Sequence, residues 1–246
     1  MGENLKYDNI VKATFIERPN RFIAHVEIDN SIEIVHVKNT GRCKELLVPQ
    51  ATVYLQKSNN PHRKTRYDLI AVEKITEKPT QEQSILINID SHAPNKVAAE
   101  WLVKQNTLFS SIQRIKPEYS LGKSRFDFLV EYKDDNNKLQ KLLVEVKGCT
   151  LEIDGIALFP DAPTIRGVKH VRHLLELHKT GEYHTMILFI IQLSGVAHFS
   201  PNKKNDPDFA YALKEAKTAG VKLFAIDTIV TPSTITHNKN ITIILN

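Results

Sequence analysis

The stretch GKSRFDFLVEYKDDNNKLQKLLVEVK, residues 122–147, decides the fold of this chain. Apolar and polar side chains alternate on both sides of a run of Asp and Asn, which favour turns, so the stretch predicts a β-hairpin. Side chains two apart in a strand share a face. If the hairpin closes near Asn136, Asp127 lies almost directly across from Glu145. Two carboxylates and Lys147 then stand together on one face of the sheet.

This cluster points to phosphodiester chemistry. Two like charges opposite each other destabilise a sheet unless a cation offsets them. Carboxylate oxygens suit Mg²⁺ or Mn²⁺, which keep some water and take further ligands from a substrate phosphate. A neighbouring lysine can hold an attacking water or stabilise charge on the phosphate. A plain hairpin with a charged solvent face is the alternative, because Glu-x-Lys also occurs at Glu131 and Lys133 and at Glu215 and Lys217.

Length and composition are those of a soluble globular protein with one large domain or two ordinary ones. The chain has 246 residues, of which 41% are hydrophobic and 25% are charged. Its only cysteines, Cys43 and Cys149, lie far apart, which argues for a reducing, cytoplasmic location and against a disulfide framework. The N-terminal stretch MGENLKYDNI lacks the pattern of a signal peptide, and no apolar run reaches membrane-spanning length, so no membrane partner is predicted.

The N-terminal third predicts a small β-barrel. Residues 11–75 hold about five short runs rich in β-branched and aromatic residues, separated by Pro, Asn, Asp and Gly turn signals. An OB-fold is the first candidate, because small barrels of that kind often bind oligonucleotides. We place this domain at residues 1–82, with a polar, proline-containing connector at its end.

Basic residues gather in the loops of the predicted barrel. The net charge of +5 suits a polyanion such as nucleic acid. Cations interleaved with aromatic residues fit a surface that follows a phosphate backbone and stacks on bases. The residues concerned are Arg18, Arg21, Phe22, Arg42, Arg63, Lys64 and Tyr67. A solvated basic surface with the aromatic residues in the core is the alternative, and many cytosolic proteins are mildly basic.

Residues 83–246 predict a mixed α/β domain with helices on the faces of its sheet. A helix capped by Asp90 or Ser91, with Pro94 in its first turn, precedes the hairpin. Later elements are expected as a strand over 156–159, a helix over 166–180, a strand over 185–193, a helix over 206–218, a strand over 221–226 and an edge strand over 241–245. The strands on either side of the helix over 206–218 are expected to run parallel, with a right-handed crossover.

The helix expected over 166–180 begins with basic side chains. Arg166 and Lys169 lie near its start, and a helix N-terminus with cations is a good phosphate site. His170 and His173 are three residues apart, but two histidines beside several cations make a poor site for a divalent metal.

Several stretches together resemble the sugar fermentation stimulation protein A family. They are RPNRF (18–22), HVKNTGRCKELLVP (36–49), RKTRYDLIAVE (63–73), EYSLGKSRFDF (118–128), LVEVKGCTL (143–151) and FPDAPTIRGVKHVRHLLEL (159–177). The resemblance covers nearly the whole chain. It implies an N-terminal OB-like β-barrel and a C-terminal restriction-endonuclease-like domain similar to PD-(D/E)xK nucleases, with a mixed sheet flanked by helices.

The resemblance also implies roles for single residues. Asp127 matches the first metal acid and Glu145 the second, with Mg²⁺ or Mn²⁺ as the ion. Lys147 matches the catalytic lysine. Glu118 matches an auxiliary acid on the preceding segment.

Other residues are implied as contacts to nucleic acid. They are Arg166, Lys169 and His170 on the following helix, with Asn39 and Arg125 in the matching stretches. The sequence departs from the family pattern at Gln50, where a glycine is common, and at Leu193, where an arginine usually follows the glutamine. The second change would remove one phosphate contact, and neither change touches the predicted metal ligands.

Three functions stay open at this point. A metal-dependent nuclease acting on DNA, or on RNA, follows from the carboxylates and the lysine. A non-catalytic DNA-binding regulator of sugar metabolism genes is the alternative that the family name suggests, although no strong helix-turn-helix pattern supports sequence-specific reading. An interaction scaffold within a nucleic-acid complex is the third. Any of the three could act as a homo-oligomer.

Overall fold

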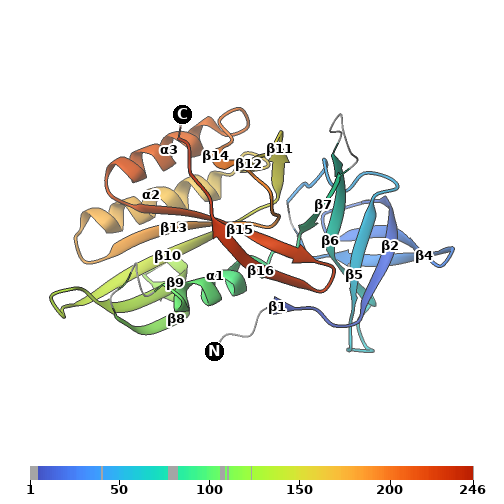
Figure 1. Ribbon diagram of the computed structural model, residues 1–246, viewed down its shortest axis with the longest axis horizontal. Helices are drawn as coiled ribbons and strands as arrows, with labels where there is room; N and C mark the ends of the chain where they lie inside the picture. Colours follow the sequence, from blue (N-terminus) through green and yellow to red (C-terminus); the bar gives the residue numbers. More distant parts are fainter. Residues whose placement is uncertain are drawn as a thin grey trace.

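Two units lie beside each other in the structure, a computed structural model that describes residues 5–39, 41–76, 83–105, 109, 111–122 and 124–245. Figure 1 shows a β-barrel on the right and a larger α/β unit on the left. The division placed at residue 82 lies outside the described residues and stays a prediction. The strand that follows it, β7 (Gln83–Asn88), pairs with the last strand of the barrel before the chain enters the larger unit.

The barrel is closed by pairing between two strands that are distant in sequence. Its strands are β2 (Ile10–Glu17), β3 (Ile23–Ile28), β4 (Ser31–Val37), β5 (Thr52–Lys57) and β6 (Tyr67–Thr76). They pair in the order β4-β3-β2-β5-β6, and β4 also pairs with β6, where His36 faces Asp68 and Val37 faces Leu69. Alternate side chains such as Phe15 fill the interior, because strand residues two apart share a face. The predicted OB-like barrel is confirmed.

A mixed seven-stranded sheet forms the centre of the larger unit, in the order β1-β16-β15-β13-β10-β9-β8. Its strands are β1 (Leu5–Lys6), β8 (Ser111–Leu121), β9 (Ser124–Lys133), β10 (Leu139–Cys149), β13 (His184–Ile191), β15 (Lys222–Thr231) and β16 (Thr234–Asn240). β13 runs parallel to both β10 and β15, as expected for strands joined through helices. A smaller sheet holds β11 (Leu151–Ile153), β12 (Ile156–Phe159) and β14 (His198–Pro201).

Helices cover both faces of the large sheet (Figure 1). They are α1 (Ala93–Val103), α2 (Ile165–Lys179) and α3 (Pro207–Thr218). α1 packs on the face of Leu142, Val144 and Met186. α2 and α3 pack on the opposite face, with Leu143 and Ile187. Neighbouring strand residues point to opposite faces, so the continuous apolar run in β10 serves both layers. Within the described ranges, none of these helices is long and apolar enough to cross a membrane.

The start of α1 differs from the expectation. His92 is the N-cap residue and makes no side-chain cap bond, so the prediction that Asp90 or Ser91 caps this helix is wrong. Asp90 Oδ1 accepts the backbone N–H of His92 just before the helix at 2.9 Å, while Tyr7 donates to the same carboxylate and Lys38 forms an ion pair with it.

Both edges of the large sheet also differ from the expectation. β16 pairs antiparallel with β15 after a turn at 232–233, so residues 234–240 form the strand expected over 241–245, and that prediction is wrong. The tight turn lets the chain reverse and pair with β15 several residues earlier than the sequence pattern indicated. Ile243 only bridges to Phe199. No strand was predicted for β8, which carries Pro117 at the opposite edge of the sheet, where a residue without an N–H is tolerated.

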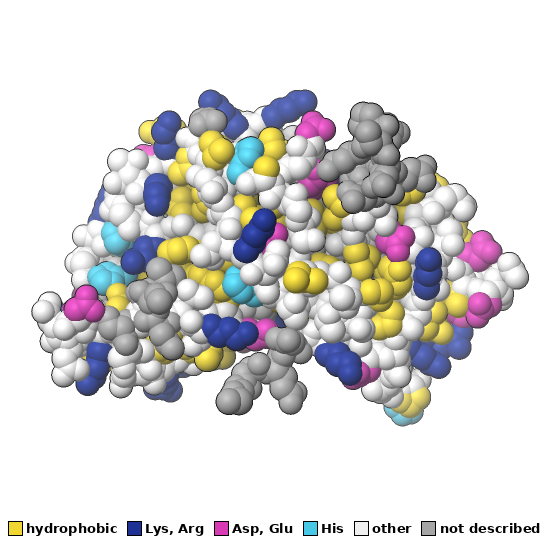
Figure 2. All heavy atoms as spheres, viewed as in Figure 1, with side chains coloured by type: hydrophobic (Ala, Val, Ile, Leu, Met, Phe, Trp, Pro, Cys, Tyr) yellow, Lys and Arg dark blue, Asp and Glu magenta, His cyan; other side chains and the backbone are white. Residues whose placement is uncertain are grey.

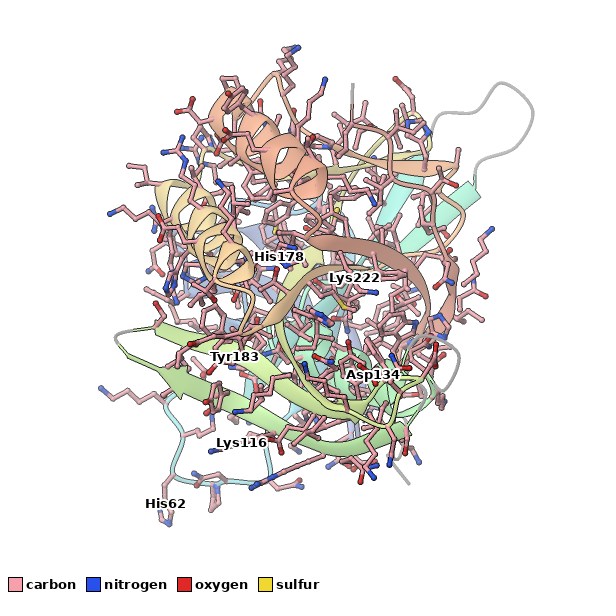
Figure 3. All side chains as sticks on the ribbon, turned by 90° about the vertical axis from the view of Figure 1, so that its left-hand side faces the viewer. His62, Lys116, Asp134, His178, Tyr183 and Lys222 are labelled. Atoms are coloured by element: carbon pink, nitrogen blue, oxygen red, sulfur yellow. The ribbon has the colours of Figure 1, made fainter. Side chains whose placement is uncertain are left out.

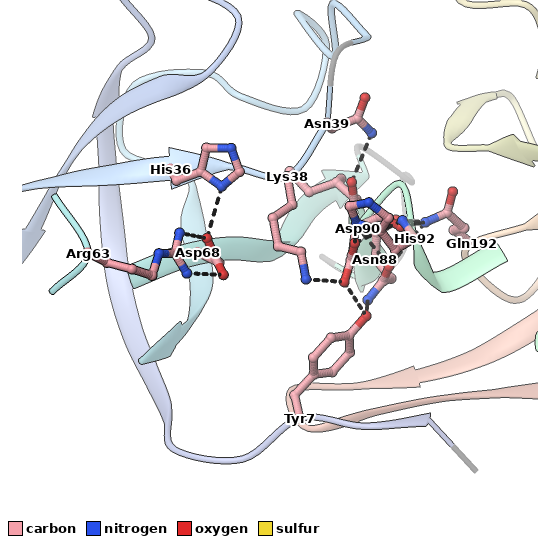
Figure 4. A network of polar contacts seen from close by, with 11 residues as sticks. Tyr7, His36, Lys38, Asn39, Arg63, Asp68, Asn88, Asp90, His92 and Gln192 are labelled. Atoms are coloured by element: carbon pink, nitrogen blue, oxygen red, sulfur yellow. Dashed lines mark hydrogen bonds and ion pairs between the residues drawn. The ribbon is translucent and has the colours of Figure 1, made fainter. Parts of the chain in front are cut away.

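A buried polar network joins the two units at Asp90. Its carboxylate accepts a hydrogen bond from the Tyr7 hydroxyl at 3.2 Å and lies 2.8 Å from Lys38 Nζ. Gln192 Nε2 donates to the carbonyl oxygens of Asn88 at 3.0 Å and of Asp90 at 3.2 Å. Figure 4 shows these side chains converging on one segment. Buried polar groups need such partners, so the network fixes the position of the barrel on the larger unit.

A second charged cluster lies where the barrel closes. Arg63 donates to both carboxylate oxygens of Asp68, at 2.8 and 2.6 Å, and His36 Nδ1 lies 2.9 Å from Asp68 Oδ1 (Figure 4). Burial opposes the ionisation of Asp68, but its hydrogen bonds to Arg63 and His36 outweigh burial and hold the pKa below its usual value.

Replacing Asp68 by asparagine should lower the free energy of unfolding at neutral pH by about 1–3 kcal/mol, because hydrogen bonds to a charged group are lost. The folded pKa is depressed, so this stabilisation is complete above the unfolded pKa of about 3.9 and disappears as the pH falls through the folded value. Urea unfolding from about pH 6 to about pH 2 should therefore show a smaller acid-induced loss in Asp68→Asn than in the wild type. Asp29→Asn, in an exposed turn, is the control. Equal acid sensitivity of Asp68→Asn and the wild type would contradict this account.

Candidate functional site

The predicted hairpin is formed by β9 and β10, and its register places Asp127 opposite Glu145. The strands pair antiparallel as far as Val144 and Phe128, so the two acids are the next residues across. The backbone N–H of Val146 donates to Asp127 Oδ2 at 2.8 Å. The alternation in the sequence therefore brings both carboxylates to one end of the hairpin and one face of the sheet.

Glu145 is a buried carboxylate with two nitrogen partners. It is 4% exposed, and its Oε1 lies 2.5 Å from Lys147 Nζ and 2.5 Å from His170 Nδ1. Burial opposes ionisation, but the hydrogen bond to His170 and the charge of Lys147 outweigh it and hold the pKa of Glu145 below its ordinary value. Glu145 is therefore an anion at neutral pH.

Asp127 lies in a different electrostatic setting. Its Oδ1 accepts a hydrogen bond from Asn95 Nδ2 at 2.8 Å. Burial, and then the negative charge of Glu145, raises the pKa of Asp127. Neighbouring carboxylates whose pKa values move in opposite directions are typical of a functional site, and a cation close to both would favour their ionised forms.

The start of α2 forms the wall that faces these acids. Thr164 caps the helix, since its Oγ1 accepts the N–H of Gly167 at 2.9 Å. A Cβ on Gly167 would lie 2.6 Å from Thr164 Cγ2, so a larger residue would disturb the cap. This start places His170 against Glu145, and Arg166 Nε lies 3.4 Å from His170 Nε2.

These side chains line a cleft of about 370 Å³ between the two units. Asn39 and Gly41 of the barrel form one side of it. The larger unit contributes Asn95, Asp127, Glu145, Lys147, Arg166, His170 and Gln192. The cleft therefore depends on the docking of the barrel as well as on the hairpin.

The oxygen donors of the cleft fit a hard divalent cation. Asp127 and Glu145 offer carboxylate oxygens and Val146 a carbonyl oxygen, which are ligands that Mg²⁺, Mn²⁺ and Ca²⁺ accept. Among the residues that the structure describes, no group of three or more His, Cys, Asp or Glu side chains is arranged to hold a metal ion. Water and a substrate phosphate would have to complete the shell. His170 and His173 are not a shared metal pair, because His173 contacts the first residue of β9 instead.

Arg18 holds the barrel side of the cleft in place. Its guanidinium donates to four backbone carbonyl oxygens: Arg21 at 2.6 Å, Asn39 at 2.7 Å, Gly41 at 2.9 Å and Arg42 at 2.8 Å. Four bonds to the backbone use most of the donors of one guanidinium. Arg18 therefore shapes the segment that carries Asn39 and Gly41.

The other predicted nucleic-acid contacts fall into two groups, of which the first lies close to the cleft. Arg21, Arg42 and Arg166 line a second, wider cavity beside it. Phe22, next to Arg21, is 54% exposed. Lys169 is exposed on α2, outside the lining of both cavities.

The second group lies away from the cleft. Arg63 and Lys64 belong to the β5–β6 connection, and Tyr67 begins β6. Figure 3 places His62, the neighbour of Arg63, at the lower margin of the molecule and away from the helices. The guanidinium of Arg63 is bound to Asp68.

Glu118 and Arg125 face solvent on β8 and β9. Their side chains are 71% and 67% exposed, and Arg125 Nη1 lies 3.7 Å from Glu118 Oε2. Neither residue lines the cleft of about 370 Å³. The structure therefore does not bring Glu118 together with Asp127 and Glu145.

Comparison with known proteins gives the same two parts. The family model described as sugar fermentation stimulation protein RE domain matches residues 92–234, and the model described as SfsA N-terminal OB domain matches residues 16–78. The chain belongs to the sugar fermentation stimulation protein family.

Relatives in this family are similar along almost the whole chain. A sugar fermentation stimulation protein homolog from Clostridium beijerinckii is 48% identical over 241 residues, which are 98% of this chain and 100% of the relative. One from Ruminiclostridium cellulolyticum is 51% identical over 237 residues, which are 96% and 98%. The structure of Pyrococcus furiosus SfsA in complex with Ca²⁺ matches with a TM-score of 0.79 and 29% identity, covering 98% of this chain and 99% of that one. The OB-like barrel and the restriction-endonuclease-like domain are thus the fold of this family.

Sequence reasoning missed Asn95 and Gln192, which also line the cleft. Gln192 directly follows β13, and a Cβ on Gly148 would lie 2.6 Å from its Oε1. The position of Gln192 at the carboxyl end of a predicted parallel strand could have indicated the site, because ligands of α/β sheets bind beyond the carboxyl ends of such strands. Asn95 carries no such signal, since its partner Asp127 is 32 residues away in the chain.

Replacing Arg18 by lysine should lower the free energy of unfolding by about 2 kcal/mol or more, because one ammonium cannot replace a planar fork that reaches four carbonyl oxygens. Arg21→Lys is the matched control, since the side chain of Arg21 is exposed and the same exchange there should change stability little. Urea unfolding of both variants measures the difference. Equal stability of Arg18→Lys and Arg21→Lys would show that Arg18 does not hold the cleft wall.

Proposed function

We propose that this chain is a metal-dependent nuclease that hydrolyses phosphodiester bonds in nucleic acid. DNA is the favoured substrate, and RNA is the alternative. The observation that carries the proposal is the pair of acids Asp127 and Glu145 on adjacent strands, with Lys147 Nζ 2.5 Å from Glu145 Oε1, inside a cleft. The Pyrococcus furiosus relative is described in complex with Ca²⁺, a hard cation that takes oxygen ligands, and this supports a divalent ion at the same kind of site here.

The two acids would be the ligands of the ion. Asp127 and Glu145, helped by the carbonyl oxygen of Val146, would hold Mg²⁺ or Mn²⁺, which supplies positive charge for the phosphate and lowers the pKa of water. The chain itself keeps these ligands in position. Asn95 Nδ2 and the backbone N–H of Val146 each take one oxygen of Asp127, at 2.8 Å. Such outer contacts orient metal ligands and are part of the site.

Lys147 is placed to act on the reacting groups. Its ammonium has three donors, of which Glu145 takes one, so the others can orient an attacking water or stabilise charge on the phosphate. Arg166 supplies a second cation at the start of α2, where the helix itself favours a phosphate. His170 acts through the oxygen of Glu145 that it contacts, and we treat it as a positioning residue.

A DNA-binding regulator of sugar metabolism genes without turnover is the second candidate. The observation that favours it is that Glu145 Oε1 already has Lys147 and His170 as partners, so this acid is stabilised by the chain alone. The carboxylates would then be structural, and the cationic side chains would bind DNA. Binding through phosphates carries little sequence information, so weak sequence preference is expected for either candidate.

Replacing Lys147 by alanine should reduce cleavage at least about 100-fold, because a donor that stabilises transition-state charge is lost. Lys141→Ala, on the same strand and exposed, is the matched control and should cut like the wild type. The assay uses labelled single- and double-stranded DNA and RNA with Mg²⁺, Mn²⁺ or EDTA. Cutting that persists in EDTA, or equally in Lys147→Ala, would contradict the proposal.

The acids are tested by changes that keep their shape. Asp127→Asn and Glu145→Gln should also abolish cleavage, because amides are poor ligands for a hard cation. Binding of nucleic acid should persist in both variants when it is measured in EDTA. Binding without cutting by the wild type under every condition would favour the regulator.

A further inference from the structure

We propose that a single-stranded polynucleotide reaches the cleft along a groove between the barrel and the start of α2. This inference rests on the proposed nuclease function and names the form of its substrate. The groove is the cavity of about 1020 Å³ beside the cleft. We call it the basic groove, after its residues Arg18, Arg21, Arg42, Lys44 and Arg166.

The basic groove is continuous with the cleft. Gly41, Asp161, Thr164 and Arg166 line both cavities. One side of the passage is the barrel segment that Arg18 holds, and the other is the start of α2. A strand that lies in the groove is therefore led to the carboxylates rather than past them.

The cations of the basic groove are free to bind an anion. Arg21, Arg42, Lys44 and Arg166 are exposed, and none of them has a carboxylate partner within the part of the chain that the structure describes. Arg18 differs from these four, because its guanidinium donates to backbone carbonyl oxygens. Four cations without a carboxylate partner among the described residues, placed along one passage, match a series of phosphates.

The two acids of the basic groove have partners other than its exposed cationic side chains. Glu17 Oε1 lies 2.8 Å from His25 Nδ1. Asp161 Oδ2 accepts the backbone N–H of Arg42 at 3.0 Å, so this acid helps to hold the Arg42 segment. Both carboxylates therefore already have partners.

Two arginines of the β5–β6 connection already have carboxylate partners. Arg63 is paired with Asp68, and Arg66 with Glu33. On the face drawn in Figure 2, Lys and Arg side chains are spread over both units instead of gathering in one place. The passage that leads to the cleft is thus favoured over the β5–β6 connection.

The apolar part of the groove's lining favours a single strand over a duplex. It consists of Leu47, Val48 and Pro49 from the barrel and Ala162 and Pro163 from the segment before α2. Bases in a duplex stack on one another and present only their edges, whereas a single strand exposes base faces that can pack on apolar side chains. Cations beside apolar side chains therefore match the phosphates and bases of one strand.

The test is binding of the full chain in EDTA, followed by fluorescence anisotropy. The probes are labelled oligothymidine and oligouridine of about 20 nucleotides, longer than the roughly 4–16 nucleotides that an OB fold covers, and a duplex of equal length. The variants are Arg42→Ala, Lys44→Ala and Arg166→Ala. Each should weaken single-strand binding roughly tenfold at about 50 mM salt and lower the slope of log K against log salt by about 0.7.

Controls fix the location of the effect. Lys12→Ala, exposed on β2 outside the basic groove, is matched to Lys44→Ala and should bind like the wild type. Lys64→Ala tests the rival path over the β5–β6 connection. Unchanged binding in the groove variants, or an equal loss in Lys64→Ala and Lys44→Ala, would overturn the path. If the duplex binds as tightly as the single strands and loses the same affinity in the groove variants, the preference for a single strand is overturned. The oligothymidine and oligouridine arms then decide between DNA and RNA.

Failure of this inference is separable from failure of the nuclease. If binding depends on the basic groove but the wild type never cuts, hydrolysis is refuted and the groove stands. If the wild type cuts and the groove variants bind and cut equally well, the groove is refuted and the nuclease stands. An unchanged unfolding temperature shows that each substitution leaves the fold intact.

Discussion

The contact of Glu145 Oε1 with Lys147 and His170 is the interaction on which the site depends. A carboxylate that is 4% exposed beside a second acid needs such partners to stay ionised. Lys147 comes from the same strand, but His170 comes from α2. Thr164 and Gly167 set the start of that helix. The ionised state of Glu145 therefore depends on the packing of α2, because that packing places His170 against the carboxylate.

The barrel completes the site instead of merely adjoining it. Arg18 fixes the segment of Asn39 and Gly41, and the network at Asp90 fixes the barrel against the larger unit. The cleft would lose one of its sides without this docking. The two parts that the family models match, residues 16–78 and 92–234, thus both line the same cleft.

Local patterns predicted the parts of this structure that depend on local pairing. The alternation along the hairpin was enough to place Asp127 opposite Glu145, because register in a hairpin follows from its turn and its buried face. Partners of charged residues could not be predicted in this way. Three arginines look alike in the sequence, yet Arg18 binds backbone carbonyl oxygens up to 24 residues away and Arg63 binds the carboxylate of Asp68. Arg42 has no carboxylate partner among the described residues and lines the wider cavity.

The barrel is joined to the larger unit by two stretches of chain that lie against each other. One follows β1, which pairs with β16, and the other follows β7 and carries Asp90. Tyr7 of the first donates to Asp90 of the second at 3.2 Å. The chain thus enters and leaves the barrel through two stretches that are tied to each other, so a change that loosens either stretch also loosens the side of the cleft that Asn39 and Gly41 form.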